Sequence, residues 1–292
     1  MKKVTKAVIL AAGLGTRMLP ATKSVPKELF PIVDKPALQY IVEELANSGI
    51  DNIMIIISRG KTLIEDHFDK SPELEERLIA GGEKKKALLD SVQGIAKNVR
   101  ICYARQKEML GTGNALMEAR AFTGDDPFVV CYGDDVIINE EYPVAKQLID
   151  AYNETGKGVV GVQAVTPEQI TSYSSMKVEN IHDNVYDLTD MIEKPKPEQV
   201  FSLFSCLGRM VLPAKIYDLL DKTTFNNGEI FLTDAMKVLS NTDGMVAVDF
   251  IGKRYDMGNK LGVMEAQVEM ALKHPEIGEG FREYLKEFCK TL

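Results

Sequence analysis

The fold is decided near the start of the chain, where the apolar run Val8-Ile9-Leu10-Ala11-Ala12 leads into Gly13-Leu14-Gly15-Thr16-Arg17-Met18-Leu19-Pro20. A buried strand that opens into a glycine-bearing loop lets backbone N–H groups approach an anion closely. Arg17 and Lys27 add cations that can neutralise several phosphates. The stretch therefore predicts a site for a nucleoside triphosphate.

Two other glycine-loop motifs fit this sequence poorly. The dinucleotide-binding pattern G-x-G-x-x-G needs a third glycine where the chain has Met18. The segment Gly60-Lys61-Thr62 looks like the end of a P-loop, but Ile55 occupies the position of its first glycine. The sequence therefore argues against both a Rossmann dehydrogenase and a P-loop enzyme.

Length and charge limit the classes of partner. The 292 residues suffice for a sizeable core, and 45% of them are hydrophobic. The formal net charge of -8 argues against nucleic acid and against an anionic membrane surface as partners, because both require a basic face. The tight basic run Lys84-Lys85-Lys86 is interpreted as a solvated surface.

Cysteine spacing and the N-terminal residues indicate the compartment. The four cysteines include no C-x-x-C pair, and the three histidines lie far from them in the sequence, so neither zinc nor a disulfide framework is indicated. The N-terminal apolar run is too short for a signal peptide, and no segment reaches the roughly 18 apolar residues of a membrane span. We therefore expect a cytoplasmic protein with reduced thiols.

Apolar runs that alternate with helical patterns predict the fold class. Strands are expected at 6–12, 53–58, 99–104 and 128–132, and helices near 37–48, 61–69 and 113–122. This order predicts an α/β protein in which helices cover both faces of a parallel sheet, whose ligands bind at the carboxyl ends of the strands. The glycine loop and the pair Asp134-Asp135 both follow strands, so we expect them to face one cleft.

Shorter strands are expected from about residue 158 onwards. They are Gly158–Val165, Lys177–Glu179, Val185–Ile192 and Cys206–Leu212, with helices at 213–221, 230–240, 259–274 and 279–290. We interpret this part as an acceptor-binding half that continues the first sheet. The chain contains no long linker or repeat, so one domain over residues 1–292 is the expected organisation.

Several short motifs resemble those of one enzyme family. They are the run from Ala11 to Lys23, Pro26-Lys27-Glu28-Leu29, Val33-Asp34-Lys35-Pro36, Arg105-Gln106-Lys107-Glu108, Glu193-Lys194-Pro195, Gly228-Glu229-Ile230, Leu232-Thr233-Asp234-Ala235 and Tyr255-Asp256-Met257-Gly258. In this order and spacing the chain resembles the bacterial UTP–glucose-1-phosphate uridylyltransferases of the sugar-phosphate nucleotidylyltransferase superfamily. The resemblance extends from residue 4 to residue 290.

The resemblance implies a Rossmann-like, three-layer α/β/α nucleotidyltransferase fold around a mixed, mostly parallel sheet. It implies conversion of UTP and α-D-glucose 1-phosphate to UDP-glucose and pyrophosphate, with Mg²⁺ as cofactor and a homodimer or homotetramer as the assembly. Residues 1–157 would mainly bind nucleotide, 158–258 would mainly bind sugar phosphate, and 259–292 would form C-terminal helices. Because both reactants are anions, the protein must align them and offset charge at the transferring phosphorus.

The resemblance also implies roles for individual residues. Arg17 would contact the leaving pyrophosphate, Lys27 the UTP phosphates, Asp134 the metal and Lys194 the phosphate of the sugar. An aspartate just past a buried strand suits Mg²⁺, which needs only one or two carboxylates besides phosphate oxygens. The remaining assignments are Ala11, Ala12, Gly13, Gly15, Thr16, Glu28, Gln106 and Gly111 for the nucleotide, Ser174, Glu193 and Glu229 with Lys194 for the sugar phosphate, and Asp256 as second metal ligand.

Three residues depart from the family pattern. Ser174 stands where a glycine is usual, Phe231 where a glutamine is common and Asn114 where a histidine is common. The side chain of Ser174 narrows the approach to its own backbone N–H, and Phe231 removes a polar group near the expected sugar pocket. The departures bear on the choice of sugar and leave uridylyl transfer itself untouched.

Two alternative functions remain open at this point. Another sugar 1-phosphate, or dTTP, would use the same chemistry, because uracil and thymine share one hydrogen-bonding edge. A non-catalytic nucleotide-sugar sensor would be expected to have lost Arg17, Lys27, Asp134 or Lys194, and all four are present. Apolar residues at helical spacing in the last two helices fit packing within the chain or contact between subunits equally well.

Overall fold

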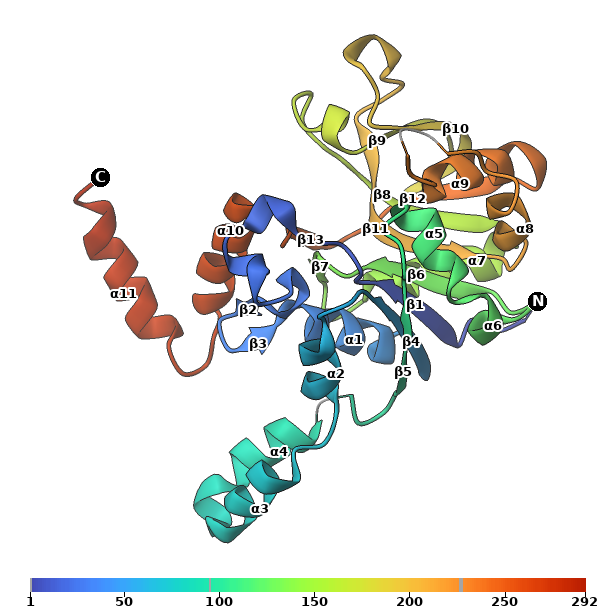
Figure 1. Ribbon diagram of the computed structural model, residues 1–292. Coiled ribbons are helices and arrows are strands. Elements are labelled where there is room, and N and C mark those ends of the chain that lie inside the picture. Colours follow the sequence, from blue (N-terminus) through green and yellow to red (C-terminus); the bar gives the residue numbers. More distant parts are fainter. Residues whose placement is uncertain (1, 95, 226–227) are drawn as a thin grey trace.

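A large mixed sheet runs through the centre of the molecule (Figure 1). The computed structural model describes residues 2–94, 96–225 and 228–292. Within them, nine strands form one sheet in the order β5-β4-β1-β6-β11-β8-β12-β10-β9. These strands are β1 (Lys6–Leu10), β4 (Asn52–Ile57), β5 (Arg100–Arg105), β6 (Phe128–Tyr132), β8 (Gly158–Ala164), β9 (Ser174–His182), β10 (Val185–Glu193), β11 (Phe204–Leu212) and β12 (Met245–Asp249).

The strand directions make this sheet mixed and mostly parallel. Strands β5, β4, β1 and β6 are parallel neighbours. Strand β11 joins β6 and β8 in the antiparallel sense, and β12 then pairs with β8 in parallel. Strands β10 and β11 run against the others, because β10 is antiparallel to both β12 and β9. The expected sheet type is confirmed, and its continuity across residue 158 supports our proposal of one domain.

Helices cover both faces of the sheet. They are α1 (Ala37–Asn47), α2 (Thr62–Phe68), α5 (Gly111–Met117), α6 (Arg120–Thr123), α7 (Val144–Thr155), α8 (Ile216–Leu220) and α9 (Leu232–Thr242). Helix α10 (Lys260–Ala271) packs instead against strands outside this sheet. Successive residues of β1 point to opposite faces, so Ile9 packs in a core cluster with α1 and α7, whereas Val8 packs with α5, α8 and α9. The three-layer α/β/α arrangement is therefore present.

Element boundaries differ from the sequence prediction in a few places. The helix expected over 113–122 is divided into α5 and α6, because the N–H groups of Glu118 and Ala119 donate to carbonyls three residues back rather than four. The three-residue strand expected at Lys177–Glu179 is the nine-residue strand β9. The structure adds β12, in the interior of the sheet, and α7, neither of which we predicted.

Two small sheets accompany the large one. Strand β2 (Pro31–Ile32) pairs with β3 (Lys35–Pro36). Strand β7 (Asp135–Ile138) pairs in the antiparallel sense with β13 (Lys253–Asp256). The second pair is important for the site, because its register places Asp256 opposite Asp135.

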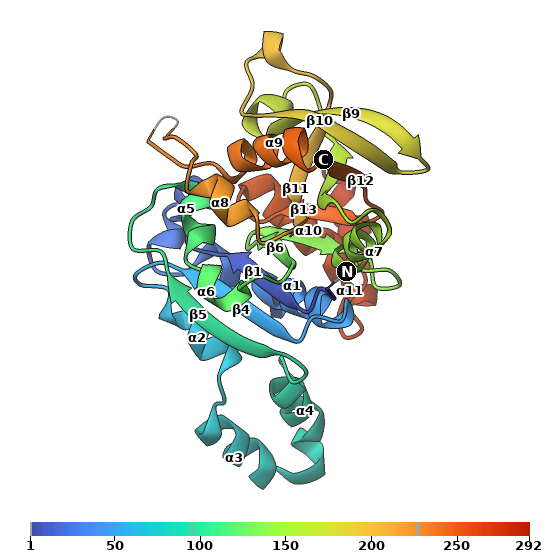
Figure 2. The ribbon, with the colours of Figure 1, turned by 90° about the vertical axis from the view of Figure 1, so that its right-hand side faces the viewer.

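Three helices extend from the body. Helices α3 (Pro72–Ala80) and α4 (Lys86–Gly94) project together away from the sheet (Figures 1 and 2), and none of their residues is buried. In α11 (Gly278–Cys289) only Gly278 is buried, and Phe281, Tyr284 and Phe288 stack along the helix with ring centroids 6.2 and 6.0 Å apart. Every helix in the described residues is too short or too polar to cross a membrane.

Candidate active site

The glycine loop begins where the central parallel strand ends. Ala11 N–H donates to the carbonyl of Ile56 at 2.9 Å, and Gly133 N–H donates to the carbonyl of Leu10 at 3.0 Å. These bonds hold the carboxyl ends of β4, β1 and β6 side by side, as expected for neighbouring parallel strands. The loop that follows Ala11 and the Asp134-Asp135 pair that follows β6 therefore lie at one edge of the sheet.

A cavity of about 530 Å³ lies at this edge, and we call it the nucleotide cavity. It is lined by twelve of the residues that we predicted from the sequence: Ala12, Gly13, Gly15, Thr16, Lys27, Glu28, Gln106, Gly111, Asp134, Glu193, Lys194 and Glu229. Residues from both sequence halves line one cavity, since Glu193 ends β10 and the loop follows β1.

A second cavity of about 560 Å³ adjoins the first, and we call it the charged cavity. It contains the predicted residues Arg17, Asp134, Lys194 and Asp256. Asp134 and Lys194 line both cavities, together with Tyr132, and so form their common wall. Tyr173 and Arg254 also line the charged cavity and were absent from the sequence prediction.

Lys27 and Asp134 form an ion pair at the common wall. The Lys27 ammonium contacts Asp134 Oδ2, with both side chains mostly buried. Burial acts to lower the pKa of Lys27, but the carboxylates of Asp134 and Glu28 outweigh it and raise that pKa. Lys27 is therefore firmly cationic at neutral pH, which is the state needed to bind a phosphate.

Asp134 and Asp256 come together through the pairing of β7 with β13. Met257 N–H donates to the backbone carbonyl of Asp134 at 2.8 Å, and Gly258 N–H donates to Asp256 Oδ1 at 2.8 Å. A Cβ atom added to Gly258 would lie 2.6 Å from Asp134 Oδ2, 2.8 Å from Arg17 Nη2 and 2.9 Å from Asp256 Oδ1. The two carboxylates and the Arg17 guanidinium thus converge beside this glycine, and the carboxylates offer the oxygen ligands that suit a hard divalent cation.

Arg254 and Tyr173 hold the acidic side chains in place. Arg254 Nε donates to Asp135 Oδ1 at 2.7 Å, and the Tyr173 hydroxyl donates to Asp256 Oδ2 at 2.8 Å. Although burial opposes it, Arg254 and Tyr173 lower the pKa of Asp256 and keep it ionised. Asp135 is occupied by Arg254 and is 5% exposed, so Asp134 is the member of the pair that faces both cavities.

Gln106 and Gly111 lie at one end of the nucleotide cavity. Gln106 Nε2 donates to the Gly111 carbonyl at 3.0 Å and to Asn114 Oδ1 at 2.9 Å, so both its hydrogens are used within the protein. Oε1 is left as an acceptor. Gly111 has a φ of 93°, and a Cβ there would lie 2.7 Å from the carbonyl oxygen of Ile230, so no other residue fits.

Glu193, Lys194 and Phe231 lie at another part of the nucleotide cavity. Burial raises the pKa of Glu193, whose Oε2 accepts a hydrogen bond from Thr233 at 3.2 Å. Lys194 is exposed, and its Nζ lies 5.4 Å from the centroid of the Phe231 ring. Lys194 has a φ of 45°, and its N–H donates to the carbonyl of Tyr173 at 2.7 Å.

Two predicted residues lie outside the walls of both cavities. Ala11 is fully buried, and it contributes a backbone carbonyl rather than a surface. Ser174 is 3% exposed, its N–H donates to Ser205 Oγ at 3.2 Å, and its hydroxyl accepts from Cys206 N–H at 3.2 Å. The backbone N–H of Ser174 is thus already bonded within the protein, and contact of Ser174 with the sugar phosphate stays a prediction.

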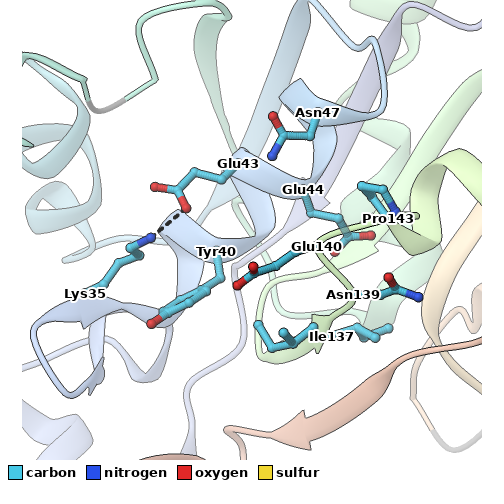
Figure 3. A pocket seen from close by; sticks show the side chains of 10 residues that line it. Lys35, Tyr40, Glu43, Glu44, Asn47, Ile137, Asn139, Glu140 and Pro143 are labelled. Atoms are coloured by element: carbon cyan, nitrogen blue, oxygen red, sulfur yellow. Dashed lines mark hydrogen bonds and ion pairs between the residues drawn. The ribbon is translucent and has the colours of Figure 1, made fainter. Parts of the chain in front are cut away.

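A further cavity of about 320 Å³ lies apart from these residues, between α1 and the segment after β7 (Figure 3). Glu43 pairs with Lys35 at 2.7 Å at its rim. Glu44 is 8% exposed and binds the fully buried Arg209 at 2.6 Å, which ties α1 to β11. None of the residues that we predicted for the active site lines this cavity.

The comparisons agree with the geometry. The family model for nucleotidyl transferases matches residues 6–273. A UTP–glucose-1-phosphate uridylyltransferase of Bacillus subtilis is 47% identical over 290 residues, covering 99% of this chain and 97% of that protein. UTP–glucose-1-phosphate uridylyltransferase 2 of Staphylococcus saprophyticus is 45% identical, covering 100% of this chain and 99% of that protein.

Solved structures give the same result. A UDP-glucose pyrophosphorylase complexed with UDP-glucose has a TM-score of 0.85 and 35% identity, over 93% of this chain and 100% of the other. A UTP-bound pyrophosphorylase from Acinetobacter baumannii has a TM-score of 0.88 and 35% identity, over 97% of this chain and 99% of the other. The chain therefore belongs to the nucleotidyl transferase family, among its UTP–glucose-1-phosphate uridylyltransferases, which confirms the resemblance seen in the sequence motifs.

Proposed function

We propose that this chain transfers a uridylyl group from UTP to α-D-glucose 1-phosphate, releasing pyrophosphate and forming UDP-glucose. The observation that carries the proposal is the common wall, where Asp134 and Lys194 line two adjoining cavities beside Lys27. Transfer between two anionic substrates needs charged groups at the point where the reacting phosphates, the metal and the leaving pyrophosphate meet. The names of the full-length relatives support the same reaction.

The base of the nucleotide is recognised by Gln106, whose side-chain amide is held in one orientation by its own hydrogen bonds. Gln106 uses both Nε2 hydrogens on Gly111 and Asn114, so Oε1 faces a ligand only as an acceptor. Uracil carries a donor at N3, whereas cytosine carries an acceptor there. Gln106 therefore favours UTP over CTP, and it leaves the choice between UTP and dTTP to the space beside the base.

The triphosphate is held by the glycine loop and Lys27. Gly13, Gly15 and Thr16 line the nucleotide cavity beside this lysine, and a Cβ at Gly13 would lie 3.7 Å from Lys27 Nζ. Backbone N–H groups and one ammonium can then share the charge of the phosphates. Arg17 lines the adjoining charged cavity, where it would contact the leaving pyrophosphate.

Enzymes of this family generally use a divalent metal, and we propose Mg²⁺ for this chain. Asp134 and Asp256 would hold it, since their oxygens converge beside Gly258. Bound there, Mg²⁺ would offset negative charge on the phosphate oxygens of the nucleotide.

The sugar phosphate is held by Lys194, Glu193 and Glu229. Lys194 supplies a cation at the common wall, and Glu193 and Glu229 supply acceptors for sugar hydroxyls in the nucleotide cavity. In the reaction, a phosphate oxygen of glucose 1-phosphate attacks the α-phosphorus of UTP. The new O–P bond forms as the bond from the α-phosphorus to the bridging oxygen of pyrophosphate breaks, and no covalent enzyme intermediate is needed.

We also propose that the chain acts as a homodimer or homotetramer in the cytoplasm. The support for an assembly is the stacked row of Phe281, Tyr284 and Phe288 on α11, where Tyr284 is 60% exposed and Phe288 45% exposed. A row of exposed aromatic rings on a projecting helix is typical of a surface that pairs with another protein surface. Sedimentation of the purified chain measures its oligomeric state directly.

The test of function is pyrophosphate release with Mg²⁺ across a grid of substrates. UTP, dTTP, CTP, ATP and GTP are each combined with glucose, galactose, N-acetylglucosamine and mannose 1-phosphates. A dominant signal for UTP with glucose 1-phosphate is expected. A dominant signal in another pairing would keep the chemistry and change the substrate, whereas no release in any pairing would favour the nucleotide-sugar sensor.

A further inference from the structure

Lys61 is buried beneath the nucleotide loop. It precedes α2 and is 7% exposed, although its side chain is a cation. Its Nζ donates to the backbone carbonyls of Ala11 at 2.6 Å and Gly13 at 2.7 Å. The same Nζ lies 2.8 Å from both carboxylate oxygens of Glu28, which is 1% exposed.

These four contacts join two segments that the nucleotide cavity requires. The first is the start of the glycine loop, because Gly13 lines the cavity. The second is the turn Lys27–Leu29, because Glu28 is the residue next to Lys27. Lys61 itself lines neither the nucleotide cavity nor the charged cavity, so it acts on a ligand only through these segments.

The charge state of the group fits this arrangement. Four acceptors at 2.6 to 2.8 Å surround one nitrogen, which suits an ammonium with three hydrogens. Burial lowers the pKa of Lys61, and the Glu28 carboxylate opposes that effect. A buried cation is tolerated where it is paired and hydrogen-bonded, as it is here.

We propose that Lys61 is a positioning residue for the triphosphate, an inference that depends on the proposed use of UTP. By tying the carbonyls of Ala11 and Gly13 to Glu28, it sets the distance between the glycine loop and Lys27. Because the carbonyls of Ala11 and Gly13 accept hydrogen bonds from Lys61, the N–H groups of the loop stay free to face the nucleotide cavity. Small displacements of phosphate-binding groups lower affinity and rate by large factors. Loss of the Lys61 contacts should therefore weaken the binding of UTP and leave the binding of the sugar phosphate unchanged.

The experiment compares the unmodified chain with two double variants that remove both buried charges together. E28Q accompanies each change at Lys61, so that neither variant holds an unpaired buried charge. E28Q/K61Q keeps an N–H donor for the carbonyls, and E28Q/K61M keeps similar volume without any donor. The KM for UTP, the KM for glucose 1-phosphate, UTP binding by calorimetry and the thermal midpoint are measured for each.

The UTP KM is expected to rise about threefold from the unmodified chain to E28Q/K61Q and at least about tenfold to E28Q/K61M, because hydrogen-bond donors are lost in that order. The KM for glucose 1-phosphate should stay within about twofold. Calorimetric UTP affinity should fall in the same order. If E28Q/K61M does not fold, the step from the unmodified chain to E28Q/K61Q decides the question.

Two results would overturn the proposal. Equal UTP KM and UTP affinity in the folded variants would mean that the loop keeps its position without Lys61. An equal rise in the KM of both substrates, together with a lower thermal midpoint, would mean a purely structural role. Failure of the proposed function is distinguishable, because it would appear in the unmodified chain as no binding of UTP by calorimetry and no pyrophosphate release.

Discussion

The two adjoining cavities are built in different ways. The nucleotide cavity combines a loop of small residues, such as Ala12, Gly13 and Gly111, with charged side chains such as Lys27 and Glu193. The charged cavity is braced by side chains, with Arg254 bonded to Asp135 and Tyr173 bonded to Asp256. A backbone cradle suits the phosphates and base of any triphosphate, whereas a braced set of charges suits one precise arrangement of metal and leaving group.

The common wall is where the two cavities meet, and its residues have different expected roles. Asp134 should affect turnover through the metal, whereas Lys194 should affect mainly the binding of the sugar phosphate. Asp134, Lys194 and Tyr132 are the residues shared by the two cavities.

The largest effect is expected for Asp134→Asn. This change keeps the size of the side chain and removes the charge that faces the metal position beside Gly258. Turnover should fall at least about 100-fold, as when one strong electrostatic stabiliser is lost. Steady-state turnover is measured over a range of Mg²⁺ concentrations.

The matched control for this variant is Asp125→Asn, an exposed aspartate at which the same change should leave turnover unaltered. Near-normal turnover of Asp134→Asn at limiting Mg²⁺ would remove Asp134 from the metal site. The common wall would then separate the substrates without taking part in the chemistry.

Lys194→Ala is the second test, because Lys194 also belongs to both cavities. We expect the KM for glucose 1-phosphate to rise about 30-fold, the scale of one lost charge-assisted hydrogen bond, and the KM for UTP to rise less than about threefold. Lys196→Ala removes an exposed lysine two residues further on and should change neither constant. An equal rise in the KM values of both substrates would mean that Lys194 is not a dedicated contact for the sugar phosphate.

Much of the fold could be predicted, because it depends on local patterns. The apolar runs of β1, β4 and β6 and the loops at their carboxyl ends appear directly in the sequence. Helices α3 and α4 were not predicted, and none of their residues is buried against the rest of the chain. The five apolar-rich residues of β12 give too short a run to separate a buried strand from other buried segments.

Part of the site could not be predicted, because it depends on pairings between distant segments. Arg254 and Asp256 reach Asp135 only through the register of β13 with β7. Lys61 was set aside as an incomplete P-loop, whereas the structure brings it beneath the glycine loop because β4 and β1 are parallel neighbours. The signal that could have indicated this contact is that Lys61 and the glycine loop each follow a strand, β4 and β1, and that these strands are parallel neighbours.

Gln106→Met tests the part of the nucleotide cavity that we assign to the base. The change removes the Oε1 acceptor and keeps similar volume. The preference for UTP over CTP, measured as a ratio of kcat/KM values, should fall about tenfold, which is the scale of one hydrogen bond.

Asn114→Ala is the matched control for Gln106, because it frees one Nε2 hydrogen and leaves Oε1 in place. Its loss of preference should be smaller than that of Gln106→Met. Unchanged preference in both variants would mean that the base is selected elsewhere in the cavity.

The smallest effect is expected at Phe231, which lines the nucleotide cavity and not the charged one. Its ring centroid lies 5.4 Å from Lys194 Nζ, a cation–π distance that holds the ammonium near the common wall. Phe231→Leu should raise the KM for glucose 1-phosphate about threefold, consistent with about 0.5–1 kcal/mol for such a contact, and Phe231→Tyr should keep the original value.

The double variant Phe231→Leu with Lys194→Ala decides whether the ring acts through the lysine. If it does, the change at Phe231 has no further effect once Lys194 is gone, and the two effects are not additive. If the ring instead contacts the sugar, the effects multiply. A side chain that departs from the family pattern would in that case help to choose the sugar directly, beside Glu193 and Glu229 in the same cavity.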